Sequence, residues 1–422
     1  MSEVINSASI NYELDPAYDN LSGVNRYERA LDILKNSRAV KKVGKGVYTV
    51  KSQQGYSVYT VVYDEKSGQA SCNCPDCMKH IGEFGWECKH ILAVKIHVNN
   101  GKKARAESEE PKRDWSSYNV AQMTEGEAFK VYLKQLSELA DELADELAPK
   151  KNSKMGRPSL PLSELVFCAV MKVSSGLSSR RASVLSKNAE EENLIENNVH
   201  YNSVNKFMVR EDVTPILREL VRLSASPLSS IEHDFAIDSS GFRLNQYGDW
   251  CTQKHDVKRA HDFVKCHISS GVLSNIIADV VITPSSGEGT ADVKNFANLL
   301  EGTTGHFKVE QVSADKGYLS SANYTAAAKM HVEPFIMFKK NSKATGSSAW
   351  NKAFINAVNA PEEWLSNYHK RSNVESTFGA LKERYGETLK SKTYTGQVNE
   401  ILCKVIAYNI SVVHRANVME MI

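Results

Sequence analysis

Four potential metal ligands within a short segment constrain the fold of this chain more than any other feature of its sequence. Cys72 and Cys74 form a Cys-x-Cys pair, and Cys88 and His90 form a Cys-x-His pair after an interval of thirteen residues. Two thiolates near a strand end and a Cys/His pair at a helix start can surround one ion tetrahedrally, a ligand set that favours zinc. The sequence therefore predicts a small zinc-bound module, with a metal-linked folding energy of about 10–16 kcal/mol.

The residues around this cluster predict a β-hairpin and a short element that closes the module. Residues 46–63, GVYTVKSQQGYSVYTVVY, are rich in β-branched and aromatic side chains on either side of a polar turn near Gln54. The apolar ILAVKIHV after His90 is a short helix or strand. This arrangement resembles the SWIM zinc finger, in which the C-x-C…C-x-H pattern lies in a β-β-α unit. Cys77 and His80 offer alternative ligands, but the SWIM pattern leaves them out.

The composition narrows the class of protein. The chain has 422 residues, 41% hydrophobic and 24% charged, which is typical of a soluble globular protein of two or three domains. No apolar run approaches the roughly 20 residues of a membrane span, and the polar N-terminus lacks a signal-peptide core, so we expect an intracellular protein, cytoplasmic or nucleoid-associated. A net charge of +2 neither requires nor excludes a polyanionic partner. Four scattered cysteines predict reduced, buried thiols: Cys168, Cys251, Cys266 and Cys403.

Changes in composition divide the chain into four regions. Residues 1–100 hold the zinc finger, at about 46–98, and residues 101–154 combine a charged linker with a leucine-rich helix. Leucines recur every three or four positions in LKQLSELADELADELA, so this helix is expected to pack on a neighbour or to self-associate. Residues 155–230 are helical, and residues 231–422 contain both strands and helices.

The region 155–230 predicts short helices separated by Ser/Gly turns. Basic side chains on or between these helices fit a helix-turn-helix-like DNA-binding region. A basic helical bundle that binds nothing is the alternative. The four candidate DNA-contacting residues are Arg180, Arg181, Lys206 and Arg210.

The region 231–422 predicts a mixed sheet flanked by helices, an α/β fold, because a strand meander is followed by alternating helices and strands. We expect Asp238 and Asp315 to lie at the carboxyl ends of the strands FAID and VSAD, where ligands collect in such sheets. Asp234 is a competing carboxylate, but it precedes its strand. If Glu375 on a later helix joins the two aspartates, their mutual repulsion needs a counter-charge, and oxygen ligands suit Mg²⁺ or Mn²⁺.

The later helix carries a polar stripe. In SNYHKRSNVESTFGALKERYG, one continuous helix places Tyr368, Arg371, Glu375 and Lys382 within about 60° of one another around its axis. An apolar stripe lies beside them, so packing of this helix on the sheet would bring Glu375 to the aspartates. A surface helix with a solvated charged side is the alternative.

Three sequence blocks, taken in order, resemble a known family. AIDSSGF, SADKGY and Y-x2-R-x3-E-x6-K are similar to the blocks of insertion-sequence DDE transposases with the Y-R-E-K signature, over about residues 155–415. The resemblance implies a ribonuclease-H-like catalytic domain. It also implies that one acidic triad holds Mg²⁺ or Mn²⁺, that two cations hold DNA phosphates, and that a tyrosine positions a phosphate or a strand end. By this resemblance, the acidic triad is Asp238, Asp315 and Glu375. The two phosphate-binding cations are Arg371 and Lys382, and the tyrosine is Tyr368.

The implied activity is Mg-dependent cleavage of double-stranded DNA at the ends of a mobile element and joining of the 3′-OH ends to target DNA, in a homodimer or larger assembly. A nuclease that does not join ends and a DNA-binding protein without catalysis are the alternatives. The chain also departs from the family. The interval between Asp315 and Glu375 is too short for the β-rich insertion of many relatives, and Ala291 replaces the histidine of a common His-Asp pair, so we expect no metal role for Asp292. The zinc finger is an addition to the usual family plan, with DNA or protein as its partner.

Overall fold

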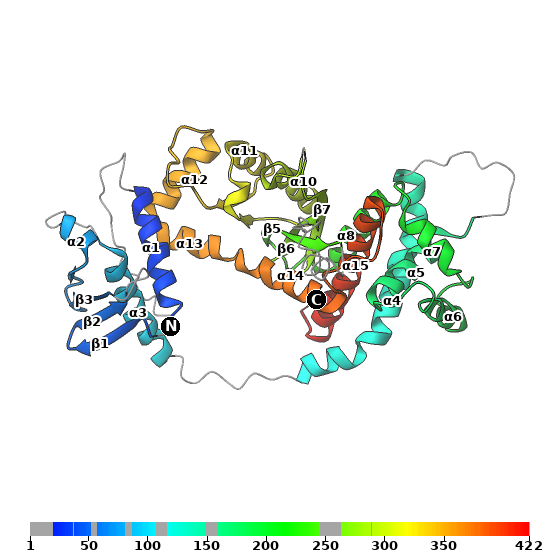
Figure 1. Cartoon of the computed structure of the whole chain (residues 1–422), viewed down its shortest axis with the longest axis horizontal. Coiled ribbons are helices and arrows are strands. Elements are labelled where there is room, and N and C mark those ends of the chain that lie inside the picture. The colour runs from blue at the N-terminus through cyan, green and yellow to red at the C-terminus, as the bar shows by residue number, and fades with distance from the viewer. Residues whose placement is uncertain are drawn as a thin grey trace, which may run out of the picture. The chain divides into compact units, whose positions relative to one another are not determined.

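The structure is a computed structural model that describes residues 20–36, 38–51, 57–80, 87–106, 116–147, 159–244, 263–287 and 289–421. Its elements are labelled in Figure 1. They form two compact units, each considered by itself. The first groups Met1–Arg113 with Phe338–Gly346 and Asn351–Ser366, and the second contains the other residues. None of the helices in the described part of the chain combines the length and the apolar character of a membrane span.

The N-terminal module of the first unit is an antiparallel sheet with helices packed on it. The strands pair in the order β1-β2-β3-β4, helix α3 packs against the sheet, and α1 packs on α3. Buried and more exposed side chains alternate along β2, as in a sheet with one covered face. The elements are α1 (Asn20–Leu34), β1 (Val40–Gly44), β2 (Val47–Lys51), β3 (Val58–Tyr63), β4 (Ala70–Cys72), α2 (Pro75–Lys79) and α3 (Lys89–Ala106).

The β2–β3 pairing confirms the predicted hairpin, in the register Val47↔Val62 to Lys51↔Val58. Its expected turn lies outside the described residues. Helix α3 continues through NNGKKARA to Ala106, where the sequence analysis predicts the start of a charged linker. Lysine, arginine and alanine are strong helix formers, so these residues extend a helix that the apolar ILAVKIHV begins. The sequence analysis also missed α1, β1 and β4.

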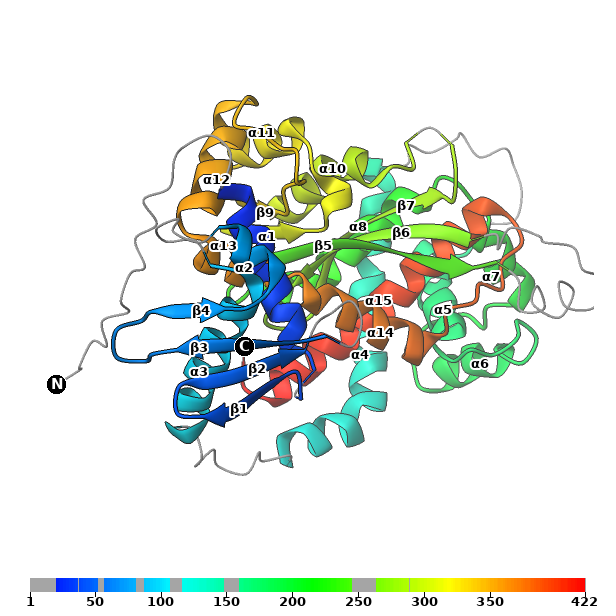
Figure 2. The ribbon, with the colours of Figure 1, turned by 60° about the vertical axis from the view of Figure 1, so that its left-hand side comes forward.

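A five-stranded mixed sheet forms the centre of the second unit, as the sequence predicts. The strand order is β7-β6-β5-β8-β9, in which β5, β6 and β7 are an antiparallel meander and β8 and β9 run parallel to β5. Helix α10 packs on one face of the sheet and α14 on the other (Figure 2). The elements are β5 (Asp234–Arg243), β6 (Phe263–Gly271), β7 (Ile277–Pro284), α10 (Asp292–Thr304), β8 (Gln311–Ala314), η2 (Lys316–Tyr318), α11 (Ser321–Lys329), β9 (Glu333–Ile336) and α14 (Ser372–Tyr385).

The interval between β8 and α14 is described in full and holds a single strand, β9. The large β-rich insertion of many DDE transposases is therefore absent, as the sequence predicts. In addition to the expected helix and strand, the interval forms two helices before α14. They are α12 (Ser348–Asn359) and α13 (Pro361–His369).

The helices that precede the sheet belong to the same compact unit as the sheet. Helix α4 packs on α5, α8 and α15, with Leu133 and Leu136 buried. Leu139 and Leu147 remain 36% and 44% exposed. The predicted packing of this helix on its neighbours is confirmed, and its self-association stays a prediction. The elements are α4 (Ser116–Leu147), α5 (Leu162–Ser174), α6 (Ser183–Glu191), α7 (Tyr201–Met208), α8 (Thr214–Ala225) and η1 (Ser226–Leu228).

The last helix, α15 (Tyr394–Val418), is buried along most of its length, from residue 396 to 414. The sequence analysis did not predict it, although ILCKVIAYNISVV is apolar around the whole helix, which is typical of a fully buried helix. The Asn409 side chain accepts a hydrogen bond from Ile277 N at 3.0 Å and donates to Ile277 O at 2.8 Å. These bonds fix α15 to β7. Of the scattered cysteines, Cys251 lies outside the described residues, and the other three are free and buried, as predicted: Cys168, Cys266 and Cys403.

A buried ion pair connects α8 to the sheet. The Asp279 side chain on β7 is fully buried and accepts hydrogen bonds from Arg218 at 3.0 and 2.6 Å and from Arg222 at 3.0 and 3.3 Å. Helix α10 approaches the same carboxylate at Gly302, where a Cβ atom would lie only 2.1 Å from Asp279 Oδ2. The pair therefore sets the spacing of α8, β7 and α10.

We predict that Asp279→Ala lowers the free energy of unfolding of the second unit by about 3 kcal/mol, because it removes the carboxylate that the partly buried guanidinium groups of Arg218 and Arg222 share and leaves Arg222 with Glu219. Urea denaturation followed by circular dichroism measures this change. Asp212→Ala is the matched control, since it breaks an exposed Arg210–Asp212 pair and should change stability by less than about 1 kcal/mol. Equal effects of the two substitutions would contradict the prediction.

Candidate functional site

Asp238 and Asp315 come together through the pairing of β5 with β8. The parallel register runs from Asp234↔Gln311 to Ile237↔Ala314, so the next residue on each strand is one of the two aspartates. The sequence analysis placed Asp238 at the end of its strand, which is incorrect. Strand β5 continues to Arg243 because β6 pairs with it along its whole length. Only the pairing with β8 ends at Asp238, so the carboxylate still lies at the opening between the two strands.

The alternation of side chains along β5 decides which face of the sheet carries the carboxylate. Asp238 lies on the face covered by α14, where its Oδ2 is 3.5 Å from Arg371 Nη1. Ser239 points to the opposite face, where its Oγ donates to Asp292 Oδ1 on α10 at 3.0 Å. Asp292 and Asp238 therefore approach β5 from different faces, and we assign no metal role to Asp292.

Glu375 reaches the site from the first turn of α14. Arg371 Nη1 lies 3.0 Å from Glu375 Oε1, so one guanidinium contacts both Glu375 and Asp238. The Glu375 side chain is 60% exposed and that of Asp238 only 21%. The three acidic side chains do not lie within 4.8 Å of one another, since the only group of that kind in the described part of the chain is formed by cysteines and a histidine. The Arg371 guanidinium thus already lies between Asp238 and Glu375.

The surroundings of Asp238 disfavour its negative charge. Burial raises its pKa above the ordinary value, and the negative charges of Asp315 and Glu375 raise it further. Two contacts lower it: the Ser239 N–H, which donates to Oδ1 at 2.8 Å, and the positive charge of Arg371. A partly buried carboxylate beside two others is a site that gains from an added cation.

The polar stripe predicted on one helix lies on two. Helix α13 ends at His369 and α14 begins at Ser372, because Lys370 and Arg371 donate main-chain hydrogen bonds to residues three positions earlier, which tightens the chain between them. Tyr368 on α13 is only 5% exposed, with its ring centre 5.9 Å from the Arg371 guanidinium. The Tyr368 ring thus provides a cation–π contact that helps to hold the Arg371 guanidinium in place.

Lys382 lies further along α14 and approaches β5 rather than the acids. Its Nζ donates to Ser240 Oγ at 2.7 Å and to the main-chain oxygen of Gly241 at 2.8 Å. Burial lowers the pKa of Lys382. The predicted apolar stripe of the helix is buried as expected at Val374, Phe378 and Leu381.

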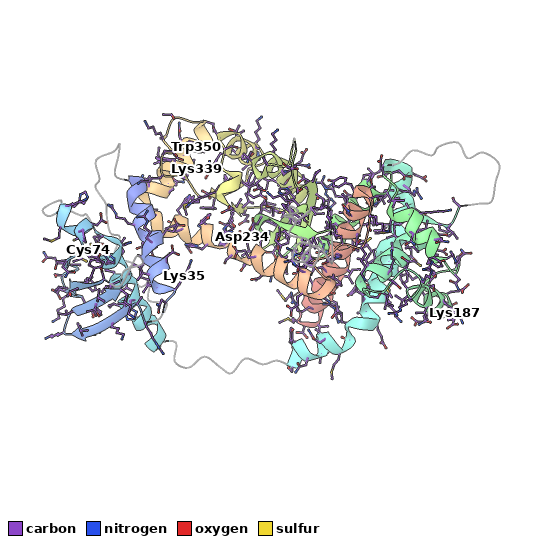
Figure 3. The ribbon with its side chains drawn as sticks, in the orientation of Figure 1. Lys35, Cys74, Lys187, Asp234, Lys339 and Trp350 are labelled. Carbon is purple, nitrogen blue, oxygen red and sulfur yellow. The ribbon has the colours of Figure 1, made fainter. Side chains whose placement is uncertain are left out.

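Asp234, the competing carboxylate, is engaged elsewhere. It begins β5, and its Oδ2 accepts from Lys370 Nζ at 2.8 Å and from Gln311 Nε2 at 2.6 Å (Figure 3). Asp234 and Asp238 are four residues apart on β5, two repeats of the strand, with Ala236 between them. The ion pair of Asp234 anchors the turn between α13 and α14 to the sheet.

In the first unit, the structure brings together Cys72, Cys74, Cys88 and His90, all of them buried and with ligand atoms within 4.8 Å of one another. His90 Nδ1 lies 3.9 Å from the Sγ atoms of both Cys72 and Cys88. A zinc ion bonded to sulfur at about 2.3 Å and to nitrogen at about 2.0 Å would hold these atoms about 3.6 Å apart, so the spacing fits a shared tetrahedral ion.

Cys77 lies outside this ligand group, although its main-chain N–H donates to Cys74 Sγ at 3.3 Å at the start of α2 (Figure 3 labels Cys74). Such a bond stabilises a thiolate. Burial lowers the pKa of His90 to about 4, so its imidazole is neutral near pH 7, the form that binds metal. The donor set and the neutral imidazole therefore suit zinc, whereas the raised pKa of the Cys74 and Cys88 thiols means that the ion would displace their protons on binding.

The basic residues of the helical region lie at its surface. Arg180 and Arg181 stand in the turn before α6, and Lys206 lies on α7; all three are exposed. Arg210 follows α7 and pairs with Asp212 at 2.7 Å. Part of its charge is thus already compensated.

A buried polar network on the α10 face was missed by the sequence analysis. Lys265 Nζ lies 2.6 Å and His267 Nδ1 lies 3.4 Å from Asp292 Oδ1, and His267 Nδ1 also lies 3.1 Å from the Tyr318 hydroxyl. Burial lowers the pKa of His267 to about 4. The signal was present, since a lysine and a histidine stand on the same face of the strand VKCHISS. The network connects β5 and the residues after β8 on the face of the sheet opposite the acidic site.

Comparisons with known proteins found a match to a family profile and a likeness to a solved structure. The sequence profile of the family described as the transposase DDE domain matches residues 230–410. Among solved structures, a cryo-EM structure of the piggyBac transposase synaptic complex with hairpin DNA is similar at 9% identity, over 70% of this chain and 76% of that one, with a TM-score of 0.34. At that TM-score the likeness says nothing about how this chain is folded or what it does.

We predict opposite shifts in the pKa of Asp238 when its two closest charges are removed. Arg371→Ala raises the pKa, because it removes a nearby positive charge, and Glu375→Gln lowers it, because it removes a negative one. Carboxyl-carbon NMR titration of labelled aspartates measures both. Arg243→Ala, which removes a cation paired with Glu387 at 3.3 Å, is the control and should leave the titration unchanged. Shifts in the same direction would show that these charges do not act on Asp238.

Proposed function

Since residues 230–410 belong to the transposase DDE domain family, we propose that the protein is a DNA transposase that cleaves phosphodiester bonds at the ends of a mobile element and joins the freed 3′-OH ends to target DNA. The observation that carries the proposal is that Arg371 contacts both Asp238 and Glu375, while Asp315 follows the strand that pairs beside Asp238. A DNA-binding protein gains nothing from a group of repelling acids. The strand order, a three-stranded meander followed by two parallel strands, supports a ribonuclease-H-like fold for this domain.

We assign the acids to metal and the cations to DNA phosphates. Asp238, Asp315 and Glu375 would hold Mg²⁺ or Mn²⁺, because hard oxygen donors that repel one another favour such ions. When bound, the metal would activate the attacking oxygen and stabilise the leaving one. Arg371 offers several N–H donors in a planar fork that matches a phosphate. A phosphate that enters the site would compete with Glu375 for this guanidinium.

The other two residues of the signature have supporting parts. Lys382 uses two of its three N–H donors on Ser240 and Gly241, so one remains for a phosphate oxygen. Tyr368 is buried beneath Arg371, and we propose that it positions the strand end through that guanidinium rather than by direct contact.

The remaining proposed contacts lie outside the catalytic domain. Exposed basic residues around α6 and α7 would bind the element ends: Arg180, Arg181, Lys206 and Arg210. Two ends must be held together for transposition, so we propose a homodimer or larger assembly on double-stranded DNA, with the exposed leucines of α4 as a candidate contact. The N-terminal module is proposed as a SWIM-type zinc finger that adds contacts to DNA or protein.

We predict that Asp238→Asn and Glu375→Gln each reduce cleavage and joining by more than about 100-fold, because each removes a charged ligand of the catalytic metal. The assay uses the element's own terminal DNA, a labelled target and Mg²⁺. Asp234→Asn is the matched control. It neutralises an acid on the same strand whose ion pair with Lys370 anchors the turn before α14, so we expect a much smaller loss of activity than in Asp238→Asn.

The other outcomes distinguish the alternatives. Cleavage without joined product in the wild type would identify a nuclease, and tight binding of the ends without chemistry in Mg²⁺ or Mn²⁺ would identify a DNA-binding protein. Loss of activity in Asp234→Asn but not in Asp238→Asn would show that the first catalytic carboxylate has been assigned incorrectly.

For the finger, we predict one bound zinc ion per chain in the wild type and none in the module of Cys88→Ser, which removes a buried ligand. Without the metal the module loses about 10–16 kcal/mol of folding energy and should unfold. Elemental analysis and protease sensitivity of the N-terminal region measure the two effects. Cys77→Ser keeps all four proposed ligands and should retain both the metal and the fold. Equal zinc content in the two variants would refute the ligand assignment.

A further inference from the structure

A large groove in the second unit begins beside Lys382 and is not part of the acidic site. Its volume is about 1320 Å³, and it is lined by the end of α5 with the turn that follows it, by the chain from the end of α14 to residue 392, and by the first half of α15. We call it the basic groove. Small-molecule sites usually fill about 300–1,000 Å³ and enclose most of the ligand, so this larger, open space is of a different kind.

Cationic side chains outnumber carboxylates in the lining of the basic groove by six to three. The carboxylates are already engaged or exposed. Glu387 pairs with Arg243, and Glu400 accepts the main-chain N–H groups of Lys390 at 3.0 Å and of Ser391 at 2.8 Å. The six cations are Lys172, Lys382, Arg384, Lys390, Lys392 and Lys404.

Most of these lysines donate hydrogen bonds to neutral oxygens, which compensate a positive charge less than a carboxylate does, whereas Arg384 pairs with Glu125. Lys172 Nζ lies 3.2 Å from Asn205 Oδ1. Lys404 Nζ lies 2.7 and 3.2 Å from the main-chain oxygens of Gly386 and Thr388, and its nearest carboxylate is 3.9 Å away. Lys390 donates to a main-chain oxygen across the groove.

Three of these lysines have lost part of their hydration. Burial lowers the pKa of Lys172, Lys382 and Lys404. A positive charge that is held away from water and bonded only to neutral groups is stabilised by an anion that enters beside it. The groove therefore favours an extended polyanion.

The position of the groove identifies this polyanion. Lys382 bonds to Ser240, which is two residues from Asp238 on the same face of β5. A chain that passes through the acidic site therefore reaches the groove along the side of the sheet. DNA carries one negative charge for about every 1.7 Å of duplex length, so a groove of this size can hold several phosphates.

We propose that the basic groove binds the phosphodiester backbone of the DNA that leads away from the acidic site. This inference rests on the proposed function. It assigns DNA contacts to residues outside the Y-R-E-K signature and outside the helical region. Lys390 and Lys392, on the exposed rim, contact phosphates directly. Lys404 instead holds the wall in place through its two main-chain acceptors.

The test compares two double variants of the full-length protein. Lys390→Ala/Lys392→Ala removes two exposed rim cations, and Lys308→Ala/Lys329→Ala removes two exposed lysines of the second unit that lie outside the helical region and the groove. Fluorescence anisotropy with a labelled DNA duplex gives the dissociation constant over a range of NaCl concentrations. Circular dichroism melting verifies that both variants are folded.

We expect the rim variant to bind roughly tenfold more weakly and to reduce the slope of log K against log salt by about two, because two phosphate contacts are lost. The control variant should keep the wild-type slope. Lys392→Glu should weaken binding further than Lys392→Ala, since it places a negative charge at the rim.

If the rim and control variants have the same dissociation constant and slope while the wild type still joins DNA ends, the basic groove is not a DNA site and the proposed function stands. A wild-type protein that binds no duplex at all would overturn both the groove and the proposed function.

Discussion

The parallel pairing of β5 with β8 is the interaction on which the candidate site depends. It stops at Ile237 and Ala314, so the next residues, Asp238 and Asp315, open side by side where the strands separate. Parallel strands place their carboxyl ends at one edge, and the two-residue repeat of a strand sends Asp238 to one face and Ser239 to the other. The pairing of β5 with β8 thus fixes how far apart the two aspartates lie, and it also decides that Asp238 faces α14.

Charge is balanced differently on the two sides of this strand. On the α14 face, Arg371 lies between two carboxylates that are proposed to bind metal. On the α10 face, Lys265 neutralises Asp292, and that acid is held by the protein alone. A partly buried carboxylate with its own lysine has little need of an added cation, whereas Asp238 shares the Arg371 guanidinium with Glu375. This difference supports a metal role for one acid and a structural role for the other.

The buried helix α15 connects the regions that the sequence treats as separate. Asn409 satisfies the main chain of β7, and Lys404 satisfies the main chain after α14, so one helix positions the sheet and the wall of the basic groove together. Buried polar groups of this kind are stable only when every donor is satisfied. The helical region and the sheet consequently form one compact unit.

The sequence alone determined the elements whose signal is local: the β2–β3 hairpin, the mixed sheet, the buried cysteines, and the spacing of the metal-ligand and acidic motifs. These follow from side-chain periodicity and from fixed intervals between reactive residues. Only the tertiary structure decided that β5 runs past Asp238, that the signature helix breaks before Ser372, that α15 packs against β7, and that Lys382 and Lys404 line one groove. Each of these depends on contacts between residues far apart in the chain, and the energy of such contacts is not written in the local pattern of either partner.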